Sequence, residues 1–575
     1  MVWWCECSRF FPSVFGVLDN GDVVKIRSDI LRIYQSLHTW TGIVTGVLLF
    51  IAFYAGALTI FKEPIDRWLS PPIEKMNSVV PEKFDSLVNQ VLGGYPESHR
   101  GFTLKLENTE SVLAPVSWSD HEGGRELDLA HSFSYATLDD SGKILVRESV
   151  PSALAELIDM LHRTAGLPFF AGHDYLGVYV LGAAAVLYFL ALISGVILLL
   201  PTLVKDLFAL REGKNRKRFW LDAHNIVGIA SLPFHMVISL TAIVFAFHDQ
   251  FYDTLSVAVY RDQPMFTRAP PSAEAFQPVN MLPVSELLNR VEQRAPNMKV
   301  TEMMFSGLDS KRPGVRVALM NTDYMVSGAR EGYLGMNPYT GDIMQTGMLP
   351  GQEGLWGSIV SKFFSLHFGS YGGNMVRWLY FALGIGGAFL FYSGNLLWLE
   401  KRRKKQRRGA ALPEQNLSCR VMASATVGVC LGSVAGVCLS LVSAKWLHGQ
   451  MSNTNYAFLL VYYTVFLSSV AWAFWRGAAR SGIELLMLCG ISALAIPLTS
   501  LLASLVPTLG WTHASLATLS VDVTALIFAL CFFYFARKAW HRAHYGAADS
   551  VWSLQSEKRE LAEGATVYRS KPVCD

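Results

Sequence analysis

Long apolar runs separated by polar segments dominate this sequence. A helix that crosses the hydrocarbon core of a bilayer needs about 20 consecutive, largely uncharged residues. Eight runs meet that length, and Asp522 interrupts the last of them. The sequence therefore predicts eight membrane-spanning helices, at Trp40–Phe61, Tyr175–Val204, His224–Phe247, Trp378–Leu399, Val421–Ala444, Tyr456–Trp475, Leu485–Val506 and Ser515–Ala536.

The composition agrees with this pattern. Of 575 residues, 51% are hydrophobic and 17% are charged, whereas soluble domains usually carry about 25% charged residues. A soluble cytosolic protein and a disordered chain are therefore excluded. The net charge is only +3, and the positive charges come in separate blocks, which argues against a nucleic-acid-binding surface.

The basic blocks predict the orientation of the chain in the membrane. Lys205–Arg218 holds six basic residues and Lys401–Arg408 holds seven, and short loops rich in Lys and Arg stay in the cytoplasm. If every run spans once, both termini lie on that side of a bacterial inner membrane. We therefore expect cytoplasmic segments at 1–36, 205–222, 400–420 and 537–575, and long periplasmic connections at 62–174 and 248–377. The spans between them are bounded at 37–61, 175–204, 223–247 and 378–399, and the last four spans lie within 421–536.

The first four spans and their connections read as two copies of one unit. The first and third spans open with similar phrases, at His38–Ile43 and His224–Ile229. The second and fourth spans each follow a Leu-His pair and carry a Ser-Gly pair near the far end. Each long connection holds an amphipathic helix candidate, at 81–92 or 283–294, and closes with an extended run, a turn and another extended run. A repeat of helix, exterior domain and helix is therefore predicted.

The predicted fold class is an all-α polytopic membrane protein with two small α+β periplasmic domains and an internally duplicated four-helix core. The last four spans have short connections and read as two added helical hairpins. Gly428, Gly432 and Gly436 recur at fourfold spacing, which predicts a face for close helix packing.

Four histidines occupy equivalent places in the two repeats. His38 and His224 lie at the cytoplasmic ends of the first and third spans, and His162 and His367 lie just before the second and fourth, at the periplasmic face. A single histidine at a membrane interface is usually an amphipathic surface residue. Two symmetric pairs at opposite faces suit axial ligation of two haem irons, because neutral imidazole nitrogen is a standard haem ligand.

Glycines near these histidines support the same interpretation. His38, His224 and His162 are each followed four residues later by a glycine, Gly42, Gly228 and Gly166. On a helix that position lies on the same face, where a missing side chain leaves room for a flat macrocycle. Tyr371 stands at this spacing from His367 and breaks the pattern.

Three further histidines are alternative ligands. His235 follows His224 by eleven residues, on nearly the same helix face, and could ligate the second haem or form a hydrogen bond inside the bundle. His173 and His248 lie at the periplasmic face and could replace His162 or His367, or line a substrate site.

Signatures of other chemistries are missing from the sequence. No phosphate loop, zinc protease motif, nucleophile elbow, dinucleotide fingerprint or covalent haem motif is present. Haem would therefore be of the non-covalent b type. Because the cytoplasmic segments are too short for a nucleotide-binding domain, the electrons would come from a quinol or from another, unidentified donor.

These residues resemble the PepSY-associated transmembrane family. The resemblance covers about residues 30–400 and rests on the His38 phrase, the strand-turn-strand ends of the exterior domains and Ala223–His235. The linker Leu200–Arg211 and the run Phe245–Gln250 are most similar to the family's iron-uptake branch. The resemblance implies PepSY-like periplasmic domains and two b-type haems that pass electrons outward to a ferric siderophore, of the hydroxamate type in the ferrioxamine-linked members.

Two interpretations from other classes compete with a reductase. Asp522 and Glu484 in the added helices suggest a siderophore or iron transporter, because acids inside a membrane segment are functional candidates. The exterior domains could also make the protein a non-enzymatic module that binds periplasmic proteins.

Overall fold

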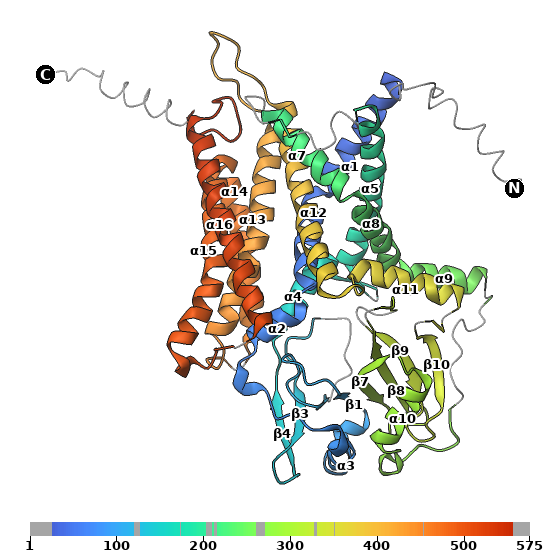
Figure 1. The fold of residues 1–575 in the computed structure, drawn as a ribbon. Helices are drawn as coiled ribbons and strands as arrows, with labels where there is room; N and C mark the ends of the chain where they lie inside the picture. Colours follow the sequence, from blue (N-terminus) through green and yellow to red (C-terminus); the bar gives the residue numbers. More distant parts are fainter. Residues whose placement is uncertain are drawn as a thin grey trace, which may run out of the picture.

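A helical region and a β-sheet make up the molecule (Figure 1). We call the side of the helical region nearest the sheet the sheet side, and the opposite side, where Lys401–Arg408 lies, the basic side. His173, one of the alternative ligands, lies outside the described part of the chain. The computed structural model describes residues 26–119, 127–172, 174–202, 210–211, 216–259, 261, 271–321, 323–326, 331–349, 351–352, 354–451, 453–513 and 515–555.

Membrane-spanning helices form most of the fold, as the apolar runs predict. Within the described residues, seven helices are long and apolar enough to cross a membrane. The protein is therefore a mostly helical, multi-pass membrane protein. The seven are α1 (Ser28–Thr59), α5 (Leu176–Leu199), α12 (Gly373–Arg402), α13 (Leu417–Trp446), α14 (Thr454–Arg476), α15 (Ala478–Leu505) and α16 (Leu516–Tyr545).

The third predicted span is broken, which corrects the expectation of one continuous helix over His224–Phe247. The helices α7 (Arg216–Ala230) and α8 (Leu232–Ala246) meet at an angle of 70°. Pro233 lies in the first turn of α8. Because proline lacks an N–H group and its ring clashes with the carbonyl four residues earlier, the helix cannot continue straight. The pair makes the eighth crossing if it counts as one span.

Four short helices line the sheet side of the helical region. They are α2 (Lys62–Leu69), α4 (Leu154–Thr164), α9 (His248–Ala258) and α11 (Leu355–Phe368). Figure 1 shows α9 and α11 running across the direction of the spans. Phe251 and Leu255 of α9 are exposed, as expected for an amphipathic helix that lies in a membrane interface. His162 comes from α4 and His367 from α11.

Each long connection contains a unit of four strands and one helix that packs on them. In both copies the last two strands form the predicted hairpin, and the amphipathic helix precedes the strands, as predicted. The elements of the first copy are α3 (Phe84–Gly94), β1 (Gly101–Lys105), β2 (Val116–Trp118), β3 (Phe133–Leu138) and β4 (Ile144–Ser149). Those of the second are α10 (Val284–Arg294), β7 (Lys299–Ser306), β8 (Gly314–Met320), β9 (Gly332–Met336) and β10 (Ile343–Met348). Two further strands, β5 (Phe170–Ala171) and β6 (Asp174–Tyr175), pair with each other.

The two predicted α+β units are both present, and they are joined through one continuous sheet. The strand order is β10-β9-β8-β7-β1-β2-β3-β4, with β1 antiparallel to β7. Each unit thus presents the same edge to the other about a pseudo-twofold axis. Alone, each would expose a row of unpaired backbone groups along β1 or β7, and pairing removes that edge. One hydrophobic cluster, which includes Leu104, Val317 and Leu334, extends through both units.

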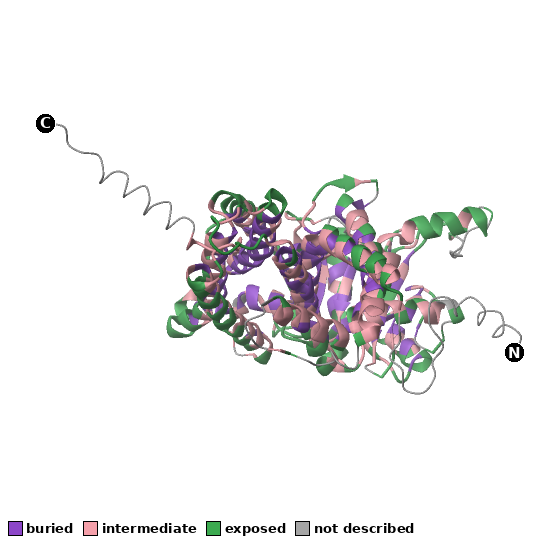
Figure 2. Ribbon diagram, turned by 90° about the horizontal axis from the view of Figure 1, so that it is seen from above, coloured by how far each residue is buried: buried purple, intermediate pink, exposed green. Residues whose placement is uncertain are grey.

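The last four spans form a unit of their own beside the duplicated helices. We call α1, α5, α7, α8 and α12 the core and α13–α16 the bundle; Figure 2 shows them from above. A Cβ atom added at Gly428, Gly432 or Gly436 of α13 would lie 2.7–2.9 Å from atoms of α14. The glycines therefore permit the close helix contact that their spacing predicts.

Candidate functional site

The four predicted histidines come together as two pairs, one near each side of the helical region. His38 of α1 and His224 of α7 have ring centres 6.4 Å apart, toward the basic side. His162 of α4 and His367 of α11 have ring centres 6.1 Å apart, toward the sheet side. The members of each pair come from different repeats, so the duplication of the chain builds both pairs.

These separations suit two imidazoles that bind one metal ion from opposite sides. A metal–nitrogen bond is about 2.0–2.1 Å, and a ring nitrogen lies about 1.1 Å from its ring centre, so the two centres would lie about 6.2–6.4 Å apart. The planes of the rings are 85° and 40° apart in the two pairs. Rotation of an imidazole about the metal–nitrogen axis leaves the distance unchanged, so both angles are compatible with such ligation.

The Nδ1 atom of every ring is held by a neighbouring helix. In the first repeat the partners are main-chain oxygens: Nδ1 of His38 lies 2.8 Å from the Ala191 oxygen, and Nδ1 of His162 lies 2.8 Å from the Ala52 oxygen. A carbonyl can only accept a hydrogen bond, so Nδ1 carries the proton in both rings.

In the second repeat the partners are hydroxyl groups. Nδ1 of His224 lies 3.1 Å from Ser393 Oγ, and Nδ1 of His367 lies 2.8 Å from Thr241 Oγ1. Ser393 donates its own proton to the Leu390 oxygen and Thr241 donates to the Val237 oxygen. Both hydroxyls are therefore left to accept from Nδ1–H.

All four rings thus have the protonation pattern of a metal ligand. With Nδ1–H engaged, the neutral ring keeps the lone pair of Nε2 free to coordinate. Burial, with a smaller effect from His162, lowers the pKa of His367 to about 3, so this ring is neutral at physiological pH. Within the described residues no group of three or more His, Cys, Asp or Glu could hold a metal ion. Two protein ligands per site fit an iron whose remaining ligands belong to a macrocycle.

Three glycines on neighbouring helices leave room for the histidine rings. A Cβ atom at Gly56 of α1 would lie 2.6 Å from Nδ1 of His162. A Cβ atom at Gly195 of α5 would lie 3.1 Å from Cε1 of His38, and the equivalent distance from Gly394 of α12 to His224 is 3.7 Å. The Ser-Gly pairs that mark the repeat in the sequence therefore lie against the histidines.

The predicted glycines behave differently from one another. A Cβ atom at Gly42 would meet nothing within 4 Å, and one at Gly228 would meet only Leu390 at 3.8 Å, so space is open beside both. Gly166 is not on a helix face one turn beyond His162, because α4 ends at Thr164. Its φ of +79° shows a turn that favours glycine for its backbone, which corrects the role predicted for it.

A cavity of about 1170 Å³ surrounds the sheet-side pair. His162 and His367 both line it, together with Arg163 and Arg377, whose guanidinium groups suit the carboxylates of a haem. The cavity also reaches Lys105 and Glu302 of the sheet. It therefore connects the sheet-side histidines with the space between the helices and the exterior domain.

Aromatic side chains fill the region between the two pairs. Ala52 follows His38 by 14 positions on α1, so the pairs are about 21 Å apart along that helix. Phe53, Tyr188 and Phe391 lie between them with ring centres 5.1–5.8 Å apart. His235 packs against Phe53 at 5.5 Å and is fully buried, and neither of its nitrogens has a hydrogen-bond partner among the described residues.

The remaining alternatives have other surroundings. Nδ1 of His248 lies 2.8 Å from the Phe245 oxygen and Nε2 lies 3.0 Å from Asp249, so both of its nitrogens have protein partners. It lines the sheet-side cavity outside the His162–His367 pair.

The two acids of the added helices are also engaged. Asp522 accepts hydrogen bonds from Trp68 Nε1 at 3.0 Å and from Ser500 at 2.9 Å. Glu484 accepts a hydrogen bond from Trp472 and pairs with Arg476. Hydrogen bonds and an ion pair within the protein therefore account for the presence of both acids. This weakens the observation that suggested a transporter.

Several residues of the site do not follow from the sequence pattern. Thr241, Gly56 and the main-chain oxygens of Ala52 and Ala191 act on rings that are far away in the sequence. Thr241 is one of many threonines in apolar segments, and no spacing distinguishes it. Ser393 could have been found, because the Ser-Gly pair recurs in both repeats.

Comparison with known proteins agrees with the duplicated core. The model of the PepSY-associated TM region family matches residues 35–401, which include all four paired histidines and end before the bundle. The chain is also 24% identical to the uncharacterized protein PA4219 of Pseudomonas aeruginosa over 373 residues, which cover 60% of this chain and 85% of that protein. This protein belongs to the PepSY-associated transmembrane family.

Proposed function

We propose that this protein is a di-haem reductase of the bacterial inner membrane that passes electrons outward to a ferric siderophore in the periplasm. The observation that carries the proposal is the pair of imidazole pairs, at 6.4 and 6.1 Å, with every Nδ1 held as a donor. His38 and His224 would hold one b-type haem and His162 and His367 the other. When bound, each haem would supply one-electron transfer.

The residues of the chain fit this task in three ways. The hydrogen bonds at Nδ1 keep Nε2 available and fix the orientation of each ring. Phe53, Tyr188 and Phe391 pack together as part of a buried apolar cluster. The sheet-side cavity extends from His162 to Lys105 of the sheet, so an acceptor can approach the sheet-side pair from the exterior domain.

The direction follows from the basic loops. If the basic side faces the cytoplasm, as Lys401–Arg408 favours, electrons leave the negative side of the membrane. Each electron that crosses then gains about 2.3 kcal/mol per 100 mV of membrane potential. Siderophores hold Fe(III) through hard oxygen ligands, so reduction to the softer Fe(II) loosens the iron.

The siderophore assignment extends the resemblance to the iron-uptake branch, whose FoxB-type members are linked to ferrioxamine. The linker Leu200–Arg211 and the run Phe245–Gln250 support it. His248, the fourth residue of that run, lines the same cavity as His162 and His367. A ferric hydroxamate siderophore is therefore the substrate to test first.

A spectrum of the purified protein tests the proposal. We expect protein from haem-replete cells to be red and to show two b-type haems in a dithionite-reduced minus oxidised spectrum. His38→Ala or His224→Ala should remove one haem, and His162→Ala or His367→Ala the other. The reduced protein should transfer electrons to ferrioxamine, followed by trapping of Fe(II) with a chromogenic chelator. A colourless wild type, or unchanged iron reduction in the fourfold alanine variant, would contradict the proposal.

A further inference from the structure

A second cavity lies between the core and the bundle, outside the sites described above. Its volume is about 1670 Å³. The core contributes Phe50, Tyr54 and Phe389, and α16 of the bundle contributes Ala525 and Phe528. The family match ends at residue 401, so the wall that the bundle contributes lies outside the matched region. Its walls are mainly apolar and aromatic.

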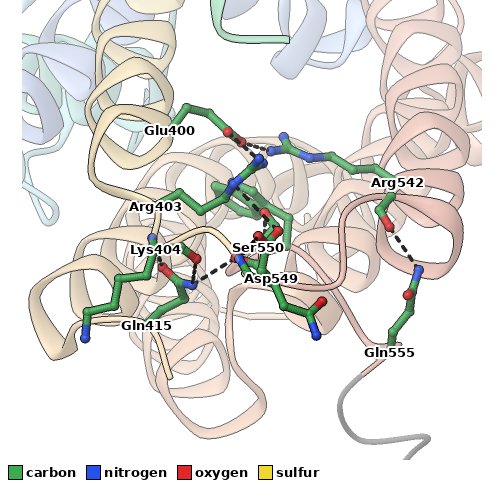
Figure 3. Close-up of polar contacts among 11 residues, drawn as sticks. Glu400, Arg403, Lys404, Gln415, Arg542, Asp549, Ser550 and Gln555 are labelled. Atoms are coloured by element: carbon green, nitrogen blue, oxygen red, sulfur yellow. Dashed lines mark hydrogen bonds and ion pairs between the residues drawn. The ribbon is translucent and has the colours of Figure 1, made fainter. Parts of the chain in front are cut away.

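The basic end of the groove carries a compact polar group (Figure 3). The side chain of Glu400 of α12 is 7% exposed, and its carboxylate pairs with Arg403 at 3.1 Å and with Arg542 of α16. Asp549 lies 3.8 Å from Arg403. The positive charges of the two arginines are therefore matched by two carboxylates, so the inner end of the groove is close to neutral.

Trp552 lies at the same end and has a donor without an acceptor. Its side chain is 8% exposed and lines the groove, and Nε1 has no hydrogen-bond partner among the described residues. A buried N–H group without a partner costs free energy. The structure thus places a donor without a partner, the Trp552 indole, at the same end of the groove as the Glu400 carboxylate. Nε of Arg403 at this end also has no hydrogen-bond partner among the described residues.

The groove is one helix away from the basic-side histidine pair. Tyr392 of α12 lines the groove, and the next residue, Ser393, holds Nδ1 of His224 on another face of the same helix. Trp220 of α7 also lines the groove and precedes His224 by one helical turn. Because a helix with its side chains is about 10–12 Å across, a ligand in the groove lies close to this pair.

We propose that this groove binds an isoprenoid quinol, with its ring at the end that Glu400 and Trp552 line and its tail along the apolar wall. A quinol hydroxyl can donate to Glu400 while a ring oxygen accepts from Trp552. A phospholipid phosphate can only accept and would carry charge into an end that is already matched. Four exposed cations at the mouth of the groove, Lys217, Lys405, Arg537 and Lys538, face water or lipid phosphates instead.

This inference rests on the proposed function, because it supplies the reductase with its donor. One quinol loses two electrons and two protons as its two O–H bonds break and the ring becomes a quinone. The protons pass to Glu400 or the imidazole of His541, which also lines the groove, and then to water on the basic side. The electrons would leave one at a time across α12 toward a haem held by His38 and His224, and two Fe(III) would be reduced to two Fe(II).

Native mass spectrometry with decylubiquinone tests the site without relying on activity. The protein would be reconstituted in nanodiscs of phosphatidylcholine and phosphatidylglycerol, and quinone adducts counted as the quinone is titrated. Ala525→Trp fills the groove from α16, so we expect at least a tenfold loss of quinone binding. The matched control, Ile527→Trp, changes a position on the same helix that is 55% exposed and does not line the groove, and should bind like the wild type.

A second variant tests the proposed ring position. Trp552→Phe removes only the free donor and should weaken decylubiquinone binding about three- to tenfold, the effect of one hydrogen bond. Equal adducts in Ala525→Trp and Ile527→Trp would overturn the proposal. Phospholipid adducts that excess decylubiquinone does not displace would also overturn it.

The two proposals can fail separately. Dithionite bypasses the quinol and should support ferrioxamine reduction equally in Ala525→Trp and wild type. Decylubiquinol should support it only in wild type and Ile527→Trp. Normal quinone binding without dithionite-driven iron reduction would refute the reductase and leave the quinone site, whereas dithionite-driven reduction without quinone binding would refute the quinone site alone.

Discussion

Removal of one hydroxyl group, in Thr241→Val, should weaken binding of the proposed sheet-side haem without changing the fold. Thr241 Oγ1 accepts the Nδ1–H of His367 at 2.8 Å and donates to the Val237 oxygen at 2.8 Å. Valine has nearly the same shape but leaves the buried Nδ1–H group without an acceptor, which costs about 1–3 kcal/mol. Loss of such an outer partner usually weakens metal binding about 10–100-fold, which equals about 1.4–2.8 kcal/mol.

The assay is a haem titration of apoprotein, followed by difference spectroscopy. We expect Thr241→Val to bind one haem like the wild type and the other about 10–100-fold more weakly. Combination with His162→Ala, which removes the weakened site, should restore a single tight titration.

Thr45→Val is the matched control for this change. Thr45 is a buried threonine of α1 whose hydroxyl donates only to the Thr41 oxygen of its own helix. It should bind both haems normally. Ser393→Ala should produce the mirror effect, with weakening only at the His38–His224 pair, since Ser393 holds His224. If Thr241→Val and Thr45→Val bind both haems equally, the hydroxyl does not orient the ligand and the reasoning fails.

Three further changes have defined outcomes. A side chain at position 42 would enter open space, so the Gly42→Leu apoprotein should unfold at the wild-type temperature. Its haem titration should nevertheless show the loss of one site. Two normal sites would exclude a macrocycle beside Gly42. Gly56→Ala places a Cβ atom 2.6 Å from Nδ1 of His162 and should displace that ring, so it should lower the affinity of the sheet-side haem in the same titration. Glu74→Gln should change how the stability of the fold depends on pH. The hydrogen bond to Glu74 raises the pKa of His448, so the pair stabilises the fold at low pH. This contribution is lost as the pH rises through the raised pKa. The side chains of His448 and Glu74 are 41% and 27% exposed, so the pair contributes less than about 1 kcal/mol to the free energy of unfolding. The wild type and Glu74→Gln should therefore differ in unfolding temperature at pH 5.5 but not at pH 9.

The periodic features of the fold could be predicted from the sequence. Apolar runs of about 20 residues give spanning helices because unpaired backbone groups are too costly in lipid. The repeated phrases give the duplication, and alternation of extended runs with turns gives the hairpins. The break at Ser231 could also have been found, since Pro233 lies two residues later.

The joining of the two exterior units could not be predicted in this way. Each half of the chain predicts its own strands, but no local sequence pattern indicates that β1 pairs with β7. That pairing depends on the positions of α1, α5, α8 and α12, from which the two connections emerge. It joins residues 101–105 with 302–306, far apart along the chain.

For the candidate site, the repeated phrases show which histidines are equivalent and predict the two pairs, because a duplicated chain repeats the same residues at the same depth. The distances within the pairs and the partners of each ring could not be read from the sequence. The acceptance of each Nδ1–H by Ala191, Ala52, Ser393 or Thr241 and the isolation of His235 depend on contacts between helices. The same holds for the groove beside α12. Sequence periodicity records which side of a helix is apolar, but the distance between two rings is set by how whole helices pack.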